Sequence, residues 1–343
     1  MRVLSLFDGV SCARVALAKA GHLSVQYFAS EIDLPAIATA KKNYPDTVHI
    51  GGVQQVTAEN VAGGGIDLLI GGSPCQDLSI ANNVRKGLAG KRSGLFWEYV
   101  RILKEVKPKY FVLENVASMP KEARKVITEA LGVEPIMIDA ALVSAQRRKR
   151  LFWTNIPGIK LPEDKQIFLK DILQPADQVD EKYFLKDEVL ETILEKMRQG
   201  KALPQSQRIY DVEGKSVTLS AGGGGLGAKT GLYIIIPEAT KKGYAVAHDG
   251  DSIDLSFPTS KTIRGRVGNK VKNLMTSQNI YTFTGARVRK LTPVECERLQ
   301  GLADGYTVGS DAQRYKMCGN AFNADVIAHI LSHMKKASPV ELA

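Results

Sequence analysis

Several features that mark other protein classes are scarce in this 343-residue chain. No apolar run is long enough to span a membrane, and the N-terminus lacks the charged-then-apolar pattern of a signal peptide. The four cysteines stand far apart without a C-x-x-C pair, and the five histidines show no zinc-ligand spacing. These absences predict a cytoplasmic protein with reduced thiols, no structural disulfide and no metal site.

The overall composition is that of an ordinary globular protein with a basic surplus. Hydrophobic residues make up 44% and charged residues 24%, and the length suffices for a full core and two domains. Lys and Arg outnumber Asp and Glu by 46 to 36, which gives a net charge of +10. This surplus indicates a polyanionic partner, nucleic acid first, although many basic proteins bind none.

The first half of the chain alternates apolar strands with helical segments. Strands are expected at residues 3–7, 27–30, 67–70, 110–113, 136–138 and 151–153. Helices are expected after a Ser11 cap, from Asp33 onward, and over residues 94–107. This alternation predicts a doubly wound α/β domain up to about residue 160.

The ends of the first two expected strands suggest a nucleotide site. Asp8-Gly9 leaves the first strand, and Glu31 closes the second 22 residues after Gly9, where an acid can bind ribose hydroxyls. Ser11 and Cys12 replace glycines of a G-x-G-x-x-G motif. Their presence disfavours a nicotinamide dehydrogenase, the alternative at the level of fold, and leaves room for a nucleoside cofactor without phosphates.

Cys75 follows a buried strand on the turn Gly71-Gly72-Ser73-Pro74. A cysteine in this setting is more often an inert packing residue than a nucleophile. A catalytic role gains support from Glu114 at the end of a neighbouring strand and from the basic run at residues 146–150. The basic stretch at residues 82–92 is expected to form a loop that closes over bound substrate, although it also fits a solvated loop.

The second half of the chain has a different texture. One helix is expected at residues 185–199, followed by β-rich sequence that the glycine run 222–225 interrupts. Such a run is most often a linker, but flanking β-type residues at 217–219 and 232–234 favour recognition loops of a small β domain. A helical pattern returns at residues 313–334.

Seven motifs in register resemble those of the C5-cytosine DNA methyltransferases. They are Phe7-Asp8-Gly9, Glu31, Pro74-Cys75-Gln76, Glu114-Asn115-Val116, Gln146-x-Arg148-x-Arg150, the pattern from Arg289 to Gly301, and Gly319-Asn320-Ala321. The resemblance spans nearly the whole chain. It implies a Rossmann-like catalytic domain at residues 1–165 plus 314–343, and a smaller, mostly β target-recognition domain at residues 166–313.

The resemblance also implies the chemistry and the cofactor. Cys75 would attack C6 of a flipped cytosine, Glu114 (kept protonated by burial) would bind N3, Arg150 would hold O2, and Arg148 would steady a loop or a phosphate. The methyl donor is S-adenosylmethionine, which leaves as S-adenosylhomocysteine. The cofactor contacts it implies are Phe7, Asp8, Gly9, Val10, Glu31, Ile32, Val53, Pro74, Leu95, Asn320 and Ala321.

Double-stranded DNA is the partner that the resemblance implies, bound by a monomer. The implied DNA contacts are Ser79, Arg92, Gln205, Arg208, Thr218, Leu219, Gly223, Gly224 and Gly225. Arg208 would read a guanine, and Gln205 would fill the space of the flipped base, although each also fits a solvated surface group. Residues 72–157 are similar to animal de novo DNA methyltransferases and residues 208–231 to bacterial GCGC-reading enzymes, so a site containing CG is expected.

Two departures from the family pattern bear on this interpretation. Gly52 stands where the family usually has an acid for the adenine amino group, and residues 234–283 are longer than the compact bacterial recognition domain. Two alternatives stay open: a tRNA methyltransferase of the same family, and a catalytically silent DNA-binding relative.

Overall fold

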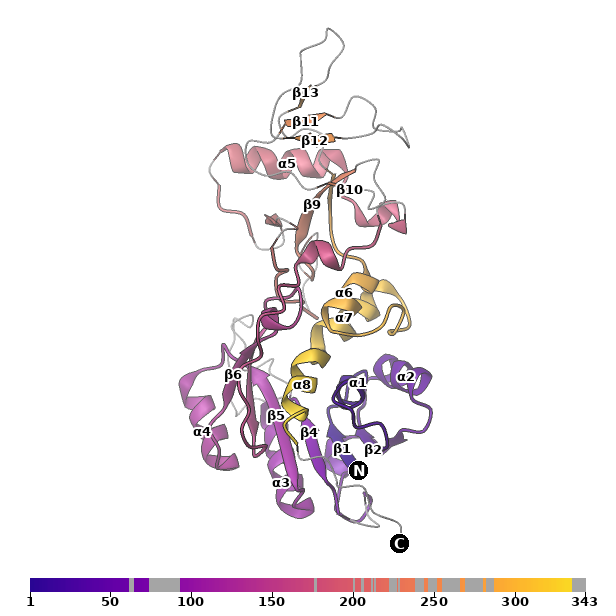
Figure 1. Ribbon diagram of the computed structural model, residues 1–343, viewed down its shortest axis with the longest axis vertical. Coiled ribbons are helices and arrows are strands. Elements are labelled where there is room, and N and C mark those ends of the chain that lie inside the picture. The colour runs from indigo at the N-terminus through magenta and orange to yellow at the C-terminus, as the bar shows by residue number, and fades with distance from the viewer. Residues whose placement is uncertain are drawn as a thin grey trace.

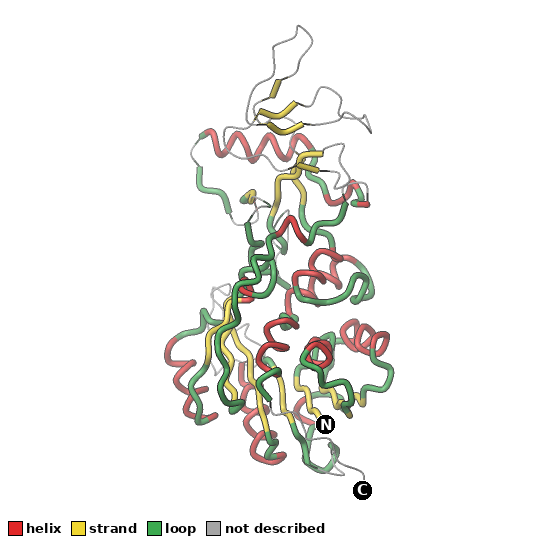
Figure 2. Tube along the Cα trace, in the orientation of Figure 1, coloured by secondary structure: helices red, strands yellow, loops and turns green. Residues whose placement is uncertain are grey.

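The computed structural model describes residues 1–61, 65–73, 93–175, 178–199, 201–204, 207–210, 212, 214–221, 227, 229–237, 244–245, 252–254, 266–268, 280–281 and 287–334. The molecule is elongated (Figure 1). A large sheet with its helices forms one end, short strands and one helix from the middle of the chain form the other, and α6 and α7 lie between them (Figures 1 and 2). Within the described residues, no helix has both the length and the apolar character to cross a membrane.

The large sheet has seven strands in the order β3-β2-β1-β4-β5-β7-β6. They are β1 (Arg2–Leu6), β2 (Gln26–Ser30), β3 (Val48–His49), β4 (Leu68–Gly71), β5 (Tyr110–Val116), β6 (Ile136–Asp139) and β7 (Lys149–Thr154). β7 pairs antiparallel with both β5 and β6, whereas β1, β2, β3, β4 and β5 pair in parallel. The predicted doubly wound α/β domain is confirmed, and its strand order reverses between β1 and β4, where such sheets bind ligands.

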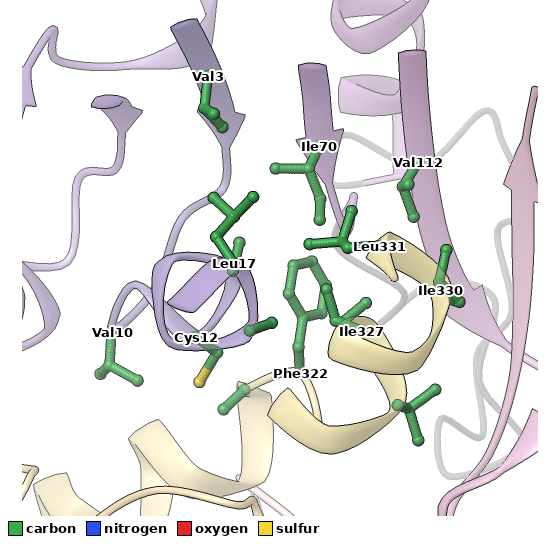
Figure 3. Close-up of a cluster of buried hydrophobic side chains, with 14 of the residues drawn as sticks. Val3, Val10, Cys12, Leu17, Ile70, Val112, Phe322, Ile327, Ile330 and Leu331 are labelled. Carbon is green, nitrogen blue, oxygen red and sulfur yellow. The ribbon is translucent and has the colours of Figure 1, made fainter. Parts of the chain in front are cut away.

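Side chains that alternate along the strands of the large sheet contribute to two hydrophobic cores, one on each face of the sheet. Val3, Ile70 and Val112 pack toward α1 (Cys12–Lys19) and α8 (Ala324–Leu331), as Figure 3 shows. Leu4, Leu69 and Leu113, which point to the opposite face, pack with Trp153 against α3 (Phe96–Val106) and α4 (Lys121–Leu131). Both faces of the sheet are therefore covered, which explains why its strands read as nearly continuous apolar runs. α2 (Leu34–Asn43) packs against the α1 side, and short 3-10 helices cover residues 53–55, 93–95, 140–142, 169–171 and 181–183.

The far end of the molecule is built mostly from short strands. One sheet contains β8 (Ile209–Tyr210), β9 (Leu232–Pro237), β10 (Tyr244–Ala245) and β14 (Arg287–Arg289), and another contains β11 (Ser252–Asp254), β12 (Arg266–Gly268) and β13 (Ile280–Tyr281). α5 (Asp187–Arg198) packs through Ile193 on β9 and β14. The helix predicted at 185–199 is thus present, whereas residues 217–219 form no strand, because this segment contacts the large domain instead.

α6 (Pro293–Leu299) and α7 (Asp311–Asn320) join the two ends. A buried cluster that includes Leu219, Cys296 and Cys318 ties both helices to the small β domain. The segment between them packs the other way, because the Tyr306 hydroxyl donates to the Val10 carbonyl (2.7 Å) and Leu302 enters the core beside α1. The joint between the domains is therefore a packed region.

Candidate active site

The turn after β1 has a backbone that few residues adopt. Phe7, Gly9 and Ser11 all have left-handed φ values, of 56°, 60° and 60°. For Phe7 and Ser11 this conformation is strained, and such strain collects at functional sites. Ser11 precedes α1 as predicted, but its side chain does not cap the helix. Its hydroxyl donates instead to the Asp8 carboxylate (2.5 Å).

Glu31 holds this turn against the end of β2. One carboxylate oxygen accepts the Gly9 N–H (2.8 Å), and the other accepts the N–H groups of Ile32 and Asp33 (2.7 and 2.9 Å). The Ile32 side chain beside it is 76% exposed, and a Cβ placed on Gly9 would meet no atom within 4 Å. Glu31 keeps about one free lone pair, the Gly9 backbone is uncovered and the Ile32 side chain is exposed. These features fit the ribose and adenine of a nucleoside cofactor.

The other residues predicted to bind the cofactor surround the same sheet edge. Val10 and Val53 are buried, Leu95 is partly buried, and Asn320 and Ala321 stand at the end of α7. The Lys316–Asp33 ion pair (2.7 Å) links α7 to the start of α2 across this edge. A Cβ on Gly52 would stand 3.4 Å from the Ile32 side chain. Pro74 lies outside the described residues.

Asp8 faces the protein interior. Its carboxylate accepts hydrogen bonds from the Tyr27 hydroxyl (2.6 Å) and the Ser11 hydroxyl, and its side chain is buried. Burial raises the pKa of Asp8 to about 6, although both hydrogen bonds lower it. The Asp8 side chain therefore supports the turn from the protein interior, and it does not extend toward a ligand.

A pH effect on stability follows from the raised pKa of Asp8. Between pH 4 and 6 the folded protein holds a proton that the unfolded chain releases, so this group's contribution to the free energy of unfolding falls as pH rises through that range. We expect Asp8→Asn to remove a difference of about 2 kcal/mol between pH 4 and pH 7. Urea unfolding of both proteins across this range measures it. A wild-type-minus-variant difference that does not change with pH would contradict the assignment.

Glu114 and Arg150 form an ion pair at the edge of the large sheet. Arg150 Nε lies 2.7 Å from Glu114 Oε1, and the two side chains are 15% and 14% exposed. Glu114 belongs to β5 itself rather than following it, and it lies opposite Phe152 of the neighbouring strand β7. The expectation was that burial keeps Glu114 protonated, and the structure adds a partner that the sequence did not predict, the Arg150 guanidinium beside its carboxyl group. A small pocket opens beside the pair, lined also by Arg148, Phe322, Asn323 and the α8 residues Val326 and Ile327.

The end of β4 lies against this ion pair. A Cβ on Gly72 would stand 3.0 Å from Glu114 Oε2 and 2.6 Å from the Phe322 ring. The next residue, Ser73, accepts hydrogen bonds from the buried Asn115 amide at its hydroxyl (3.2 Å) and carbonyl (3.4 Å). Asn115 thus fixes the point from which the chain leads into Pro74 and Cys75, and both of these lie outside the described residues.

Gly72→Ala is expected to lower the catalytic rate of this site by about 10- to 100-fold, because the added methyl displaces the Glu114 carboxylate by about an ångström or less. The crowding also costs about 1–3 kcal/mol of stability. Steady-state kinetics and thermal melting measure the two effects. Adding Phe322→Ala makes room for the methyl and should recover part of the rate, whereas Gly65→Ala, whose Cβ meets no atom within 4 Å, should behave like wild type.

Of the two tasks predicted for Arg148, steadying a loop or a phosphate, the structure favours the first. Its guanidinium is buried and donates to three carbonyls, those of Leu219 (3.3 Å), Gly319 (3.1 Å) and Ala321 (2.9 Å). A side chain enclosed in this way is not available to a DNA phosphate. The expectation that it steadies a loop agrees with its contact to Leu219. Its neighbour in the same motif, Gln146, is fully buried, and its side-chain amide has no hydrogen-bond partner among the described residues.

The predicted DNA contacts are described only in part. Arg208 is exposed on the small domain, with Nε donating to the Leu203 carbonyl (3.1 Å). Thr218 is exposed and donates to the Arg147 carbonyl (2.6 Å), whereas the Leu219 side chain is buried, so that residue can offer a ligand only its backbone. Ser79, Arg92, Gln205, Gly223, Gly224 and Gly225 lie outside the described residues.

The remaining cysteines are packing residues, as predicted. Cys12, Cys296 and Cys318 are all buried. Burial raises the pKa of the Cys12 thiol to about 12 and those of the other two well above their usual range. None of these three therefore forms the thiolate that nucleophilic catalysis requires.

Known proteins with similar sequences and structures agree on one family. The model of the family described as C-5 cytosine-specific DNA methylase matches residues 1–336. Orphan methyltransferase M.SPRI of Bacillus phage SPR is 26% identical, with 97% of each chain covered. Type II methyltransferase M.HhaI of Haemophilus parahaemolyticus is also 26% identical, over 96% of this chain and 93% of the relative.

Solved structures agree at the level of fold. The Entamoeba histolytica methyltransferase EhMeth superposes with a TM-score of 0.70 at 16% identity, and the S. pombe Dnmt2 methyltransferase with 0.63 at 17%, each covering 97% of both chains. The family match over nearly the full length accords with three features of the structure: the order of strands in the large sheet, the turn after β1 that Glu31 holds, and the Glu114–Arg150 pair. The chain therefore belongs to the C-5 cytosine-specific DNA methylase family, whose members transfer a methyl group from S-adenosylmethionine to cytosine C5.

Proposed function

We propose that this protein methylates cytosine C5 in double-stranded DNA, at a short site containing CG, through a covalent bond between Cys75 and cytosine C6. The observation that carries the proposal is the Glu114–Arg150 pair, 2.7 Å apart at the edge where Ser73 leads into Pro74-Cys75. Cytosine N3 and O2 are both hydrogen-bond acceptors, and in the proposal the Glu114 carboxyl shares a proton with N3 while the Arg150 guanidinium donates to O2. The names of M.SPRI and M.HhaI, both methyltransferases, support the same class of reaction.

Each side chain has a chemical task in this proposal. The Cys75 thiolate adds to C6, and the electron pair of the C5–C6 bond moves into the ring, where it makes C5 nucleophilic. Glu114 stabilises that charge by sharing a proton with N3, and Arg150 holds O2. For this the base must replace part of the contact between Glu114 and Arg150. The carbon C5 then takes the methyl group of S-adenosylmethionine. Water acting as a base takes the C5 proton, the freed electron pair re-forms the C5–C6 double bond, and the C6–sulfur pair leaves with Cys75 as its thiolate.

The bound cofactor supplies an electrophilic methyl on a sulfonium. The chain's own part is to orient it. In the proposal Glu31 accepts the ribose hydroxyls, Ile32 contacts the adenine, and the backbone of residues 7–10 approaches the rest of the molecule. Because Glu31 already binds three N–H groups, its carboxylate is fixed before any ligand arrives.

DNA is favoured over tRNA by the small β domain. A duplex-reading enzyme must contact bases beside the flipped cytosine, and Arg208 and Thr218 on that domain are both exposed. C5 and C6 lie inside the base stack of a duplex, so the base must leave it for Cys75 to approach. A tRNA substrate is the outcome that would replace this proposal.

Bisulfite sequencing of a plasmid incubated with the purified protein and S-adenosylmethionine tests the proposal and maps the site. We expect protection of the inner cytosine of one short motif that contains CG. A parallel reaction with total tRNA provides the comparison. Methyl transfer to tRNA with none to the plasmid would reject DNA as the substrate, and protection at motifs without CG would reject the target.

A further inference from the structure

Arg148 joins two segments that belong to different parts of the predicted site. One terminal nitrogen of its guanidinium donates to the Leu219 carbonyl, and the other donates to the carbonyls of Gly319 and Ala321. Leu219 lies just before the glycine run that is predicted to contact DNA. Gly319 and Ala321 flank Asn320, in the motif predicted to contact the cofactor. A single buried side chain therefore fixes the distance between the two segments.

Gly319 brings the same two segments into direct backbone contact. A Cβ on Gly319 would lie 2.3 Å from the Ala221 nitrogen, 2.4 Å from the Ser220 carbonyl carbon and 2.7 Å from the Ala221 Cα. These are backbone atoms, which cannot rotate away as a side chain would. Any residue larger than glycine must push residues 220–221 away from the end of α7.

The contact region is further braced from both sides. The Thr218 hydroxyl donates to the Arg147 carbonyl, and the Ser220 N–H donates to the Lys229 carbonyl (3.0 Å). On the α7 side, the Gln300 amide donates to the Cys318 carbonyl (2.5 Å). Because the carbonyls around Arg148 are buried, separating the segments would leave buried polar groups without hydrogen-bond partners, which is unfavourable. The segments are thus expected to move together.

We propose that Arg148 and Gly319 are positioning residues that couple DNA binding at residues 218–221 to cofactor binding at Asn320 and Ala321. Coupling of this kind is reciprocal, so bound DNA strengthens cofactor binding by the same factor as bound cofactor strengthens DNA binding. The inference rests on the proposed function, since it takes DNA as the ligand of the first segment. It adds that a residue of the catalytic motif acts by holding backbone, without touching substrate.

Calorimetry with S-adenosylhomocysteine tests the coupling. The dissociation constant is measured with and without a saturating duplex of about 24 base pairs that carries the mapped site. For the wild type we expect about tenfold tighter binding with the duplex. We define the coupling ratio as the dissociation constant without the duplex divided by that with it. In Arg148→Lys and Gly319→Ala this ratio should fall below about twofold. A lysine ammonium cannot donate to all three carbonyls in the geometry of a guanidinium, and the alanine methyl separates the two segments. Binding without DNA should change less than about threefold.

Matched controls separate positioning from folding. Arg124→Lys changes an exposed arginine on α4, and Gly65→Ala adds a methyl where no atom lies within 4 Å, so both should keep the wild-type ratio. Thermal melting and the fraction of binding-competent protein are recorded for every variant. If Gly319→Ala fails to fold, the inference is tested by Arg148→Lys alone, through its ratio of dissociation constants without and with the duplex.

Two results would overturn the inference while the proposed function stands: a wild-type protein that methylates the duplex but shows a ratio near one, or folded variants that keep the wild-type ratio. If the wild type transfers no methyl group to DNA, the proposed function and this inference both fail. The methylation assay on the same duplex distinguishes these cases.

Discussion

Cys75→Ser is expected to reduce methyl transfer to below about one part in 10⁴ of the wild-type rate, while binding of the duplex survives. A serine hydroxyl is barely ionised near neutral pH and is a far weaker nucleophile than a thiolate, and losing the nucleophile removes the whole covalent route. Transfer of a radiolabelled methyl group to the mapped duplex measures the rate, and gel retardation measures binding.

Cys296→Ala supplies the control for this experiment. Cys296 is buried in the cluster around α6, away from the Glu114–Arg150 pair, so its loss should cost only a little stability. Wild-type activity in Cys75→Ser would remove Cys75 from the mechanism. Loss of activity in both variants would instead point to a general effect of thiol replacement.

Glu114→Gln should lower kcat by about 10²- to 10³-fold and leave the KM for S-adenosylmethionine unchanged. Glutamine preserves the shape of the side chain, but it cannot share a proton with cytosine N3, and it leaves the largely buried Arg150 charge without its carboxylate partner. Steady-state kinetics with the mapped duplex separate the two parameters.

Glu98→Gln is the matched comparison for Glu114→Gln. Glu98 also pairs with an arginine, Arg101 at 2.8 Å, but on the surface of α3 with both side chains about twice as exposed. We expect its kinetics to match those of the wild type. If Glu114→Gln retains full kcat, charge stabilisation at N3 has another source, and the proposed task of Glu114 is wrong.

The sequence predicted the sheet and its acidic edge because both depend on local pattern. Buried strands such as β4 and β5 require short apolar runs, and the turns after them collect the polar residues. Glu31 therefore stood out before its three N–H partners were known. The family motifs added the expected order of the catalytic and target-recognition domains along the chain.

The contacts that the sequence did not predict join residues far apart in the chain. An arginine in a basic run looks the same whether it faces solvent or, like Arg148, three buried carbonyls from residues 219, 319 and 321. Phe322 was missed for a similar reason, since its contact with Gly72 exists only once α8 packs on the sheet. The one available signal was the Gly71-Gly72 pair, which allows a close approach. Ser11 fits a helix cap by type, but its left-handed backbone turned it toward Asp8.

The reversed direction of β7 has a consequence for how this protein can vary. In the β5–β7 register, Glu114 lies opposite Phe152 and Val116 opposite Arg150, so Glu114 and Arg150 are diagonal neighbours on one face of the sheet. Side chains alternate along a strand, and gaining or losing one residue between Arg150 and Thr154 would turn Arg150 to the opposite face. Length changes in the loops leave this parity intact. The Glu114–Arg150 pair thus depends on an even spacing within both β5 and β7, and we expect insertions in the loops to be tolerated better than insertions in either strand.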